Sequence, residues 1–172
     1  QHQDTLAWIP ELRLGHYSLD RKKGVMEINN VTLFNPVIKL KRYTGEEDLN
    51  LQFIVDYFQS PTDTTDTSST IVFINNFAIQ GGQFSYENQL REPRGVPGLD
   101  WNHLKISDLN LELCSFSSIG DSIYSEIGSV SGKDISGFNL VHLQSELISV
   151  PGSLKLNKAN IQTPGSNIHG DL

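Results

Sequence analysis

The sequence contains very little sulfur. Cys114 is the single cysteine and Met26 the single methionine, so an internal disulfide is excluded. A catalytic thiol needs an activating partner, and none lies near Cys114 in the sequence, so we interpret it as a small, inert residue. The five histidines are far apart and lack the spacing of metal ligands. We therefore expect no metal site and no cofactor.

Long apolar runs and enzymatic motifs are also missing. No run approaches the ~20 apolar residues that span a bilayer, and no signal peptide is visible. A P-loop, a dinucleotide fingerprint and a nucleophile elbow are absent, so we expect a protein that is not an enzyme. The net charge of −7 argues against a nucleic-acid partner. Because the chain begins at Gln1, we interpret residues 1–172 as a single β-repeat domain excised from a longer protein.

What the sequence does contain is a repeat. Only 37% of the residues are hydrophobic, and the abundant Ser, Asn, Gly and Thr favour short strands and turns. The segment 28–40 recurs as 74–86 and, more weakly, as 156–168. In each copy an apolar residue is followed by others three and five places on, by Pro or Gly at eight, and by an apolar residue at twelve. Repeats of this length indicate a stacked or meandering β architecture.

The spacing within the repeat constrains the backbone. Ile28 and Val31 are three residues apart and cannot share a face of a regular strand. If both are buried, the strand must change phase at Asn29-Asn30, and again at Asn35-Pro36, where Pro interrupts pairing. With about a dozen short strands, the chain is predicted to be mainly β. We expect a curled antiparallel or meandering sheet, a β-taco or irregular β-coil, with a hydrophobic concave face.

One stretch has helical rather than strand spacing. Leu49, Phe53, Ile54 and Tyr57 recur at helical intervals, with Phe58 beside them, and predict a short amphipathic helix over 48–59. We expect this helix to cap one end of the concave face. The polar segment 60–70 and the Pro- and Gly-rich segment 88–98 are predicted to be flexible loops.

The apolar set itself is the candidate site. Its members are Ile28, Val31, Leu33, Ile38, Leu40, Phe77, Ile79, Phe84, Tyr86, Leu109, Leu111, Leu113, Phe138, Leu140, Ile161 and Ile168. These residues could form an ordinary core between two sheets. They could also line an open hydrophobic groove that holds the acyl chains of lipids. The pattern leaves both interpretations open.

Several runs of residues resemble a known family. The runs 81–86 (GGQFSY), 98–109 (GLDWNHLKISDL), 136–140 (SGFNL) and 161–166 (IQTPGS) are similar to the AsmA/TamB group of envelope proteins, especially the TamB-like proteins of Bacteroidota. The run 48–53 (DLNLQF) resembles the short helix that follows an early hairpin in those proteins. The resemblance extends from about Leu12 to the end of the chain.

The resemblance implies a location and a function. Family members are anchored in the inner membrane by an N-terminal helix and cross the periplasm as a curled β-sheet. Its hydrophobic interior is thought to conduct phospholipids towards the outer membrane. The implied partners are phospholipid acyl chains and an Omp85-type outer-membrane barrel, the latter engaged through regions outside this segment and linked to outer-membrane protein assembly.

A second hypothesis belongs to a different class. The many Asn, Ser and Thr residues and the long polar loops are also typical of a structural or adhesive β-domain of a secreted protein. Such a domain would bind a glycan or a protein through loop aromatics such as Trp101 and Tyr124. It would have a closed core, which distinguishes it from an open groove.

Overall fold

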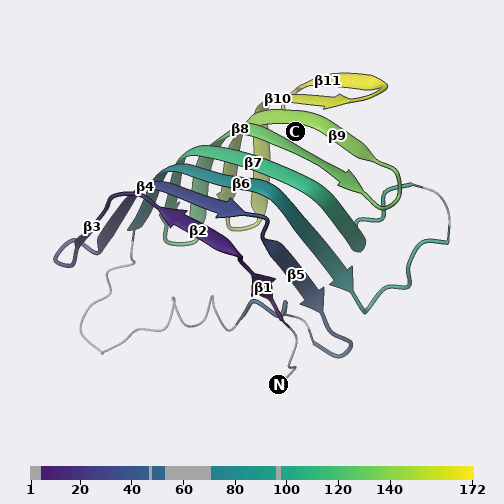
Figure 1. Ribbon diagram of the computed structural model, residues 1–172, viewed down its shortest axis with the longest axis horizontal. Helices are drawn as coiled ribbons and strands as arrows, with labels where there is room; N and C mark the ends of the chain where they lie inside the picture. Colours follow the sequence, from purple (N-terminus) through teal and green to yellow (C-terminus); the bar gives the residue numbers. More distant parts are fainter. Residues whose placement is uncertain (1–4, 47, 53–70, 96–97) are drawn as a thin grey trace.

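The chain forms one curled, open, mixed sheet (Figure 1). The computed structural model describes residues 5–46, 48–52, 71–95 and 98–172. The strands are β1 (Ala7–Trp8), β2 (Glu11–Leu14), β3 (Tyr17–Asp20), β4 (Val25–Phe34), β5 (Val37–Arg42), β6 (Ile71–Asn88), β7 (His103–Ile119), β8 (Ser122–Asp134), β9 (Asn139–Val150), β10 (Ser153–Thr163) and β11 (Ser166–Gly170). The prediction of a mainly β, curled sheet is confirmed. Among the described residues, no helix has the length and hydropathy of a membrane span.

The topology has two parts. From β6 to β11 each strand pairs antiparallel with the next, as a meander. The N-terminal strands attach differently, because β4 and β5 pair parallel with β6. On the other side of them, β2 and β3 pair with β4, and β1 pairs with β5. The prediction of an antiparallel or meandering sheet was therefore incomplete: the sheet contains one parallel junction.

That parallel junction is formed by the repeat. The first copy lies in β4 and β5 and the second in β6, with Ile28 opposite Ile74 and Leu40 opposite Tyr86. Asn75 Nδ2 donates to Asn29 Oδ1 at 2.7 Å, a pair separated by 46 residues in the sequence. The third copy lies elsewhere, in the β10–β11 hairpin, and pairs with neither of the others. Two of the three copies are therefore in-register neighbours.

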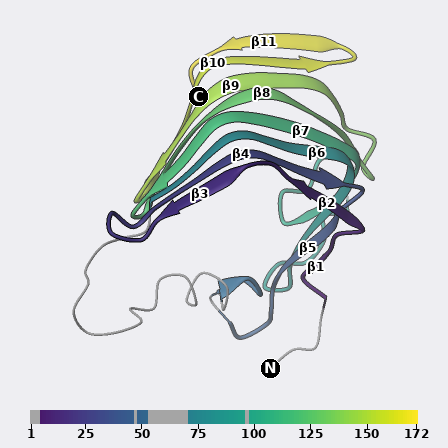
Figure 2. The ribbon, with the colours of Figure 1, turned by 60° about the vertical axis from the view of Figure 1, so that its left-hand side comes forward.

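The sheet bends where neighbouring strands change phase together. Figure 2 shows β4 and β6 to β9 curving side by side as one layer. On one line across the strands, Asn35, Gly81 and Asp108 have φ angles of 48°, 66° and 51°. On a second line Ser115 and Lys158 both have φ of 52°. We call these lines the Pro36 crease and the Asn29 crease, and they lie at the two phase changes that the repeat spacing predicts.

The helix predicted over 48–59 is not seen among its described residues, 48–52. Leu49 instead forms an isolated antiparallel bridge with Arg42, and Asn50 N donates to Lys41 O at 2.8 Å. The Asn50 side chain also accepts from Lys41 N and donates to Lys39 O. These bonds hold the start of the predicted helix against the end of β5. The helical spacing of the apolar residues therefore does not determine the backbone conformation here. The other predicted capping residues, Phe53, Ile54, Tyr57 and Phe58, lie outside the described residues, as does the loop predicted over 60–70.

The loop predicted over 88–98 follows the end of β6. Asn88 is buried, accepts from Leu90 N and donates to Asn102 Oδ1. Asp100 accepts from the backbone N–H groups of Arg94 and Asn102. These hydrogen bonds favour the carboxylate and lower the pKa of Asp100. Side-chain amides and one carboxylate thus replace regular pairing between β6 and β7.

Candidate functional site

Strand pairing aligns apolar side chains in rows that cross the whole sheet. Residues opposite one another in a ladder point to the same face. One row contains Leu12, Leu33, Ile79, Leu111, Val130, Leu143, Ile161 and Ile168. It runs from β2 to β11 and every member is apolar. We call the face that carries this row the inner face.

Further rows lie parallel to the first. On one side of it lies the row Leu14, Val31, Phe77, Leu113 and Ile127, which reaches Ser145 on β9. Beyond the Asn29 crease lies the row Tyr17, Ile28, Ile74 and Phe116. Beyond the Pro36 crease lie the shorter rows Ile38, Phe84 and Ile106, and Leu40, Tyr86 and Leu104. The inner face is therefore apolar over most of its area.

Burial identifies the inner face as the concave side. Each strand contacts only the strands to which it is hydrogen-bonded, so in the described part of the chain only curvature can bring side chains of one face together. The buried residues Leu33, Ile79, Ile127 and Ala159 all lie on the inner face. Pro36, at its crease, is fully buried.

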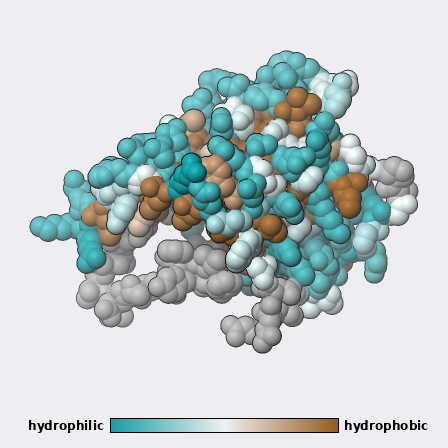
Figure 3. Space-filling model, in the orientation of Figure 1, coloured by the Kyte–Doolittle hydropathy of each residue, from teal (hydrophilic) through white to brown (hydrophobic). Residues whose placement is uncertain are grey.

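The opposite face has a different character. On the strands that carry the first row, the outward positions include Arg13, Thr32, Ala78 and Glu112. The Arg13 guanidinium lies 4.4 Å from the centre of the Phe34 ring on this outer side. In Figure 3 hydrophobic residues appear as separate groups among hydrophilic ones. The two faces of the layer thus differ in polarity.

The creases allow inner-face side chains to converge. A Cβ atom at Gly82 would lie 2.7 Å from Ile79 Cγ2 and 3.3 Å from Pro36 Cγ. A Cβ atom at Gly132 would lie 2.8 Å from Ile106 Cγ2. Both glycines leave room for a neighbouring apolar side chain on the concave side.

The predicted groove residues have these positions. Leu33 and Ile79 are buried, and Ile28, Val31, Ile38, Leu40, Phe77, Phe84, Tyr86, Leu109, Leu111, Leu113, Leu140 and Ile161 are partly exposed. All of these lie in or beside the inner-face rows. Ile168 ends the first row at β11 and is 51% exposed, whereas Phe138 lies in the turn between β8 and β9, away from the rows. A filled core between two sheets is not found among the described residues.

Sequence reasoning missed several inner-face residues. They include Leu12, Leu14, Tyr17, Ile74, Phe116, Ile127, Val130, Leu143 and Leu147. The signal was present on β7, where Leu104, Ile106, Leu109, Leu111, Leu113 and Phe116 repeat the same steps of two and three. This spacing would have identified β7 as a strand that crosses both creases.

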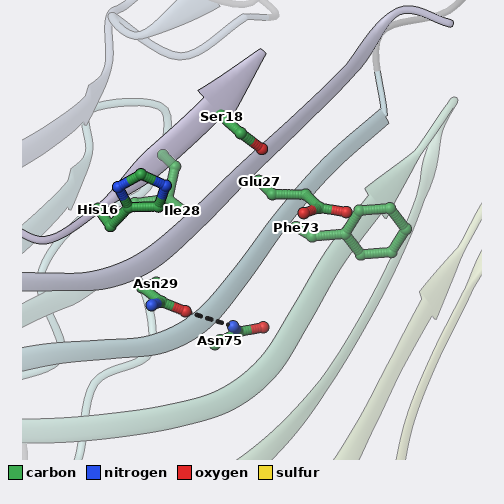
Figure 4. Close-up of a pocket in the computed structure, with 7 residues that line it drawn as sticks. All are labelled: His16, Ser18, Glu27, Ile28, Asn29, Phe73 and Asn75. Atoms are coloured by element: carbon green, nitrogen blue, oxygen red, sulfur yellow. Dashed lines mark hydrogen bonds between the residues drawn. The ribbon is translucent and has the colours of Figure 1, made fainter. Parts of the chain in front are cut away.

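The outer face carries a small polar cavity at the Asn29 crease. It measures about 320 Å³ and is lined by His16, Ser18, Glu27, Ile28, Asn29, Phe73 and Asn75. Figure 4 shows the Asn29–Asn75 hydrogen bond in this cavity, between two parallel strands. A second cavity of about 540 Å³ lies beside the β6–β7 loop, near Asp100 and His103. Within the described ranges, no group of three His, Cys, Asp or Glu residues is placed to hold a metal ion.

The inner face has the length and the apolar character that an elongated apolar molecule requires. Its longest row crosses the sheet from β2 to β11, and strand spacings of ~4.8 Å give a length of roughly 34 Å. One leaflet of a bilayer is about 15 Å of hydrocarbon, half of the ~30 Å core. An extended acyl chain therefore fits along the rows with room to move.

Comparison of this chain with family models, with curated proteins and with solved structures finds no match. Any function proposed for this chain must therefore be inferred from the inner face itself.

Proposed function

We propose that the inner face binds the acyl chains of phospholipids and that the chain is a non-enzymatic, periplasmic part of an envelope protein of the AsmA/TamB type. The protein would bridge the inner and outer membranes and pass lipid along this face. The observation that supports the proposal is the uninterrupted apolar row from Leu12 to Ile168, on a concave face that no other described strand covers. The membrane anchor and the contacts with an Omp85-type barrel would belong to regions outside residues 1–172.

The openness of the face predicts weak and reversible binding. Full burial of an acyl chain of about 14 carbons would contribute roughly 11 kcal/mol, at ~0.8 kcal/mol per methylene. A single curved layer covers about half of that surface, which leaves roughly 5–6 kcal/mol and a Kd on the order of 0.1 mM. Such an affinity suits a surface along which lipids move better than a site that stores them.

The adhesive alternative receives less support. It requires a closed core, and the described strands form a single open layer. Of the two aromatics predicted in loops, Trp101 lies in the turn before β7, whereas Tyr124 lies on strand β8; both are exposed, and the strand pairing does not bring them together.

Photocrosslinking from two positions on one strand tests the proposal. Phe77 lies on the inner face of β6, and Phe73 lies on the outer face four residues earlier. A benzophenone amino acid replaces each phenylalanine in turn, and the purified proteins are irradiated with vesicles that contain a radiolabelled phospholipid. We expect lipid adducts at position 77 and few at position 73.

Two results would contradict the proposal. Equal labelling at the two positions would mean that the lipid contacts the chain without using the inner face. Labelling at neither position, with a folded protein by circular dichroism, would mean that the face does not bind lipid.

A further inference from the structure

We infer that this chain forms a twofold-symmetric dimer through β2 and β3, in which the two inner faces join into one. This inference concerns a second copy of the chain and holds whether or not the face carries lipid. On the described residues, β2 and β3 pair with β4 alone, so their other side is unpaired. An unpaired edge presents a row of backbone donors and acceptors to another strand.

The side chains along this edge are apolar and exposed. Leu12, Leu14, Tyr17 and Leu19 are 55%, 52%, 62% and 47% exposed, and all four lie on the inner face. Leu33, which is opposite Leu12 on the next strand, is only 9% exposed. The difference between these exposed fractions indicates how much apolar surface a further strand would bury. Natural edge strands usually carry charges or prolines at such positions instead.

The backbone donors of the same residues point away from the sheet. Gly15 N donates to Asn30 O at 2.8 Å, and Asn29 N donates to His16 O at 2.8 Å. In an antiparallel pair every second residue faces the same neighbour. Because Gly15 faces β4, the backbone groups of Leu14 and Leu12 face the unpaired side of the edge. Because His16 also faces β4, the backbone groups of Tyr17 and Leu19 face the unpaired side as well.

The pattern of outward residues reads the same in both directions. Leu12, Leu14, Tyr17 and Leu19 are separated by two, three and two positions. Their spacing is therefore symmetric about a centre between Gly15 and His16, at the Asn29 crease. A second copy rotated by half a turn about an axis through that centre places its Leu19 opposite Leu12. It also places its Tyr17 opposite Leu14. Every outward donor then meets an outward acceptor, and both sheets bend at the same place.

Charge and symmetry are compatible with this arrangement. On the outer side the pairing brings Glu11 near Asp20 of the second copy. Each carboxylate already has a cation, since Arg13 lies 2.7 Å from Glu11 and Lys23 lies 3.7 Å from Asp20. A head-to-tail contact with β11 would engage only a short strand and would not close, whereas twofold dimers are the commonest closed assemblies.

Cysteine crosslinking tests the register. In a Cys114→Ser background, one preparation carries Leu14→Cys and another carries Tyr17→Cys. Residues in hydrogen-bonded antiparallel pairs have Cα atoms ~5.5 Å apart, which a disulfide can bridge. We expect a disulfide-linked dimer when the two preparations are mixed and oxidised. The Leu14→Cys preparation alone should not crosslink, because position 14 of the second copy lies three residues, roughly 10 Å, further along the edge.

Sedimentation supplies the second measurement. The unmodified chain should sediment as a dimer at high concentration. The double variant Leu14→Lys with Tyr17→Lys should raise the dimer Kd by about tenfold or more, which corresponds to ~1.4 kcal/mol. Ile168→Lys, on the opposite edge, is the matched control and should leave Kd unchanged. A chain that stays monomeric, or a Tyr17→Cys preparation that crosslinks to Ile168→Cys instead, would overturn the dimer and leave the proposed function standing.

Discussion

At the scale of single residues, the sheet relies on a few buried polar groups. Asp134, at the end of β8, is only 7% exposed. Its carboxylate accepts from Lys105 N and from Ser136 N, both at 2.9 Å. Burial raises the pKa of Asp134, but the hydrogen bonds with Ser136, Lys105 and Ile135 outweigh it and lower the pKa overall. The ionised side chain thus ties the start of β7 to the β8–β9 turn.

Replacing Asp134 should reduce stability in a pH-dependent way. Asp134→Ala leaves two backbone donors without this acceptor and should cost about 1–3 kcal/mol in urea unfolding at neutral pH. Because the folded pKa is lowered, the stabilisation is present above the unfolded-state pKa and is lost as pH falls through the folded pKa. The difference between the proteins should therefore shrink in acid.

A matched control separates this effect from general loss of charge. Glu146 forms an exposed ion pair with Lys158, and Glu146→Ala should cost only about 0–1 kcal/mol. If the two variants were equally stable at neutral pH, the buried carboxylate would have no special role.

At the scale of elements, the creases determine which side chains share a face. The step of three from Ile28 to Val31 predicted the first phase change, because no regular strand can place those two residues on one face. The second was predicted at Asn35-Pro36, because Pro interrupts strand pairing. The sequence could not predict that β4, β6 and β7 would change phase side by side, since that depends on which strands pair. Over 48–52, the described part of the predicted helix, hydrogen bonds between Asn50 and β5 hold the backbone against the sheet in spite of the local apolar spacing.

The Pro36 crease should be sensitive to a single added methyl group. A Cβ atom at Gly82 would lie too close to Ile79 Cγ2, so Gly82→Ala must displace a buried side chain. We expect a loss of about 1–3 kcal/mol in chemical unfolding. Gly165→Ala is the control, because no atom lies within 4 Å of the added carbon. An unfolding free energy unchanged by Gly82→Ala would show that the crease can relax freely.

At the scale of the whole molecule, the open inner face is the property that sequence reasoning left undecided. Alternating apolar residues look the same in a filled sandwich and in a single curved layer, since both give strands one apolar face. The difference is that, among the described residues, the strands form one layer and no second layer packs on it. The extent of the face was underestimated because single residues on β8 and β9, such as Val130 and Leu143, gained meaning only from their position in a row.

An open apolar face should make the folded chain sensitive to amphiphiles. A single-chain lysophospholipid below its micelle concentration, at about ten times its Kd, should stabilise the fold by ~1.4 kcal/mol. That corresponds to a rise in Tm of about 2–6 °C, measured by circular dichroism. Phe77→Ser on the inner face should reduce the rise, whereas Phe73→Ser on the outer face should preserve it. A rise that both variants lose equally would point to a binding surface other than the inner face.

The parallel junction between β4 and β6 also has a kinetic consequence. From β7 onward the strands are joined by turns of two to four residues, so each can pair as soon as its neighbour forms. The junction instead joins residues 46 positions apart, and closing the longer loop costs additional chain entropy. Contacts between distant residues form late in folding. The meander should therefore assemble first, and the N-terminal strands should add to its edge as a separate, slower phase in stopped-flow refolding.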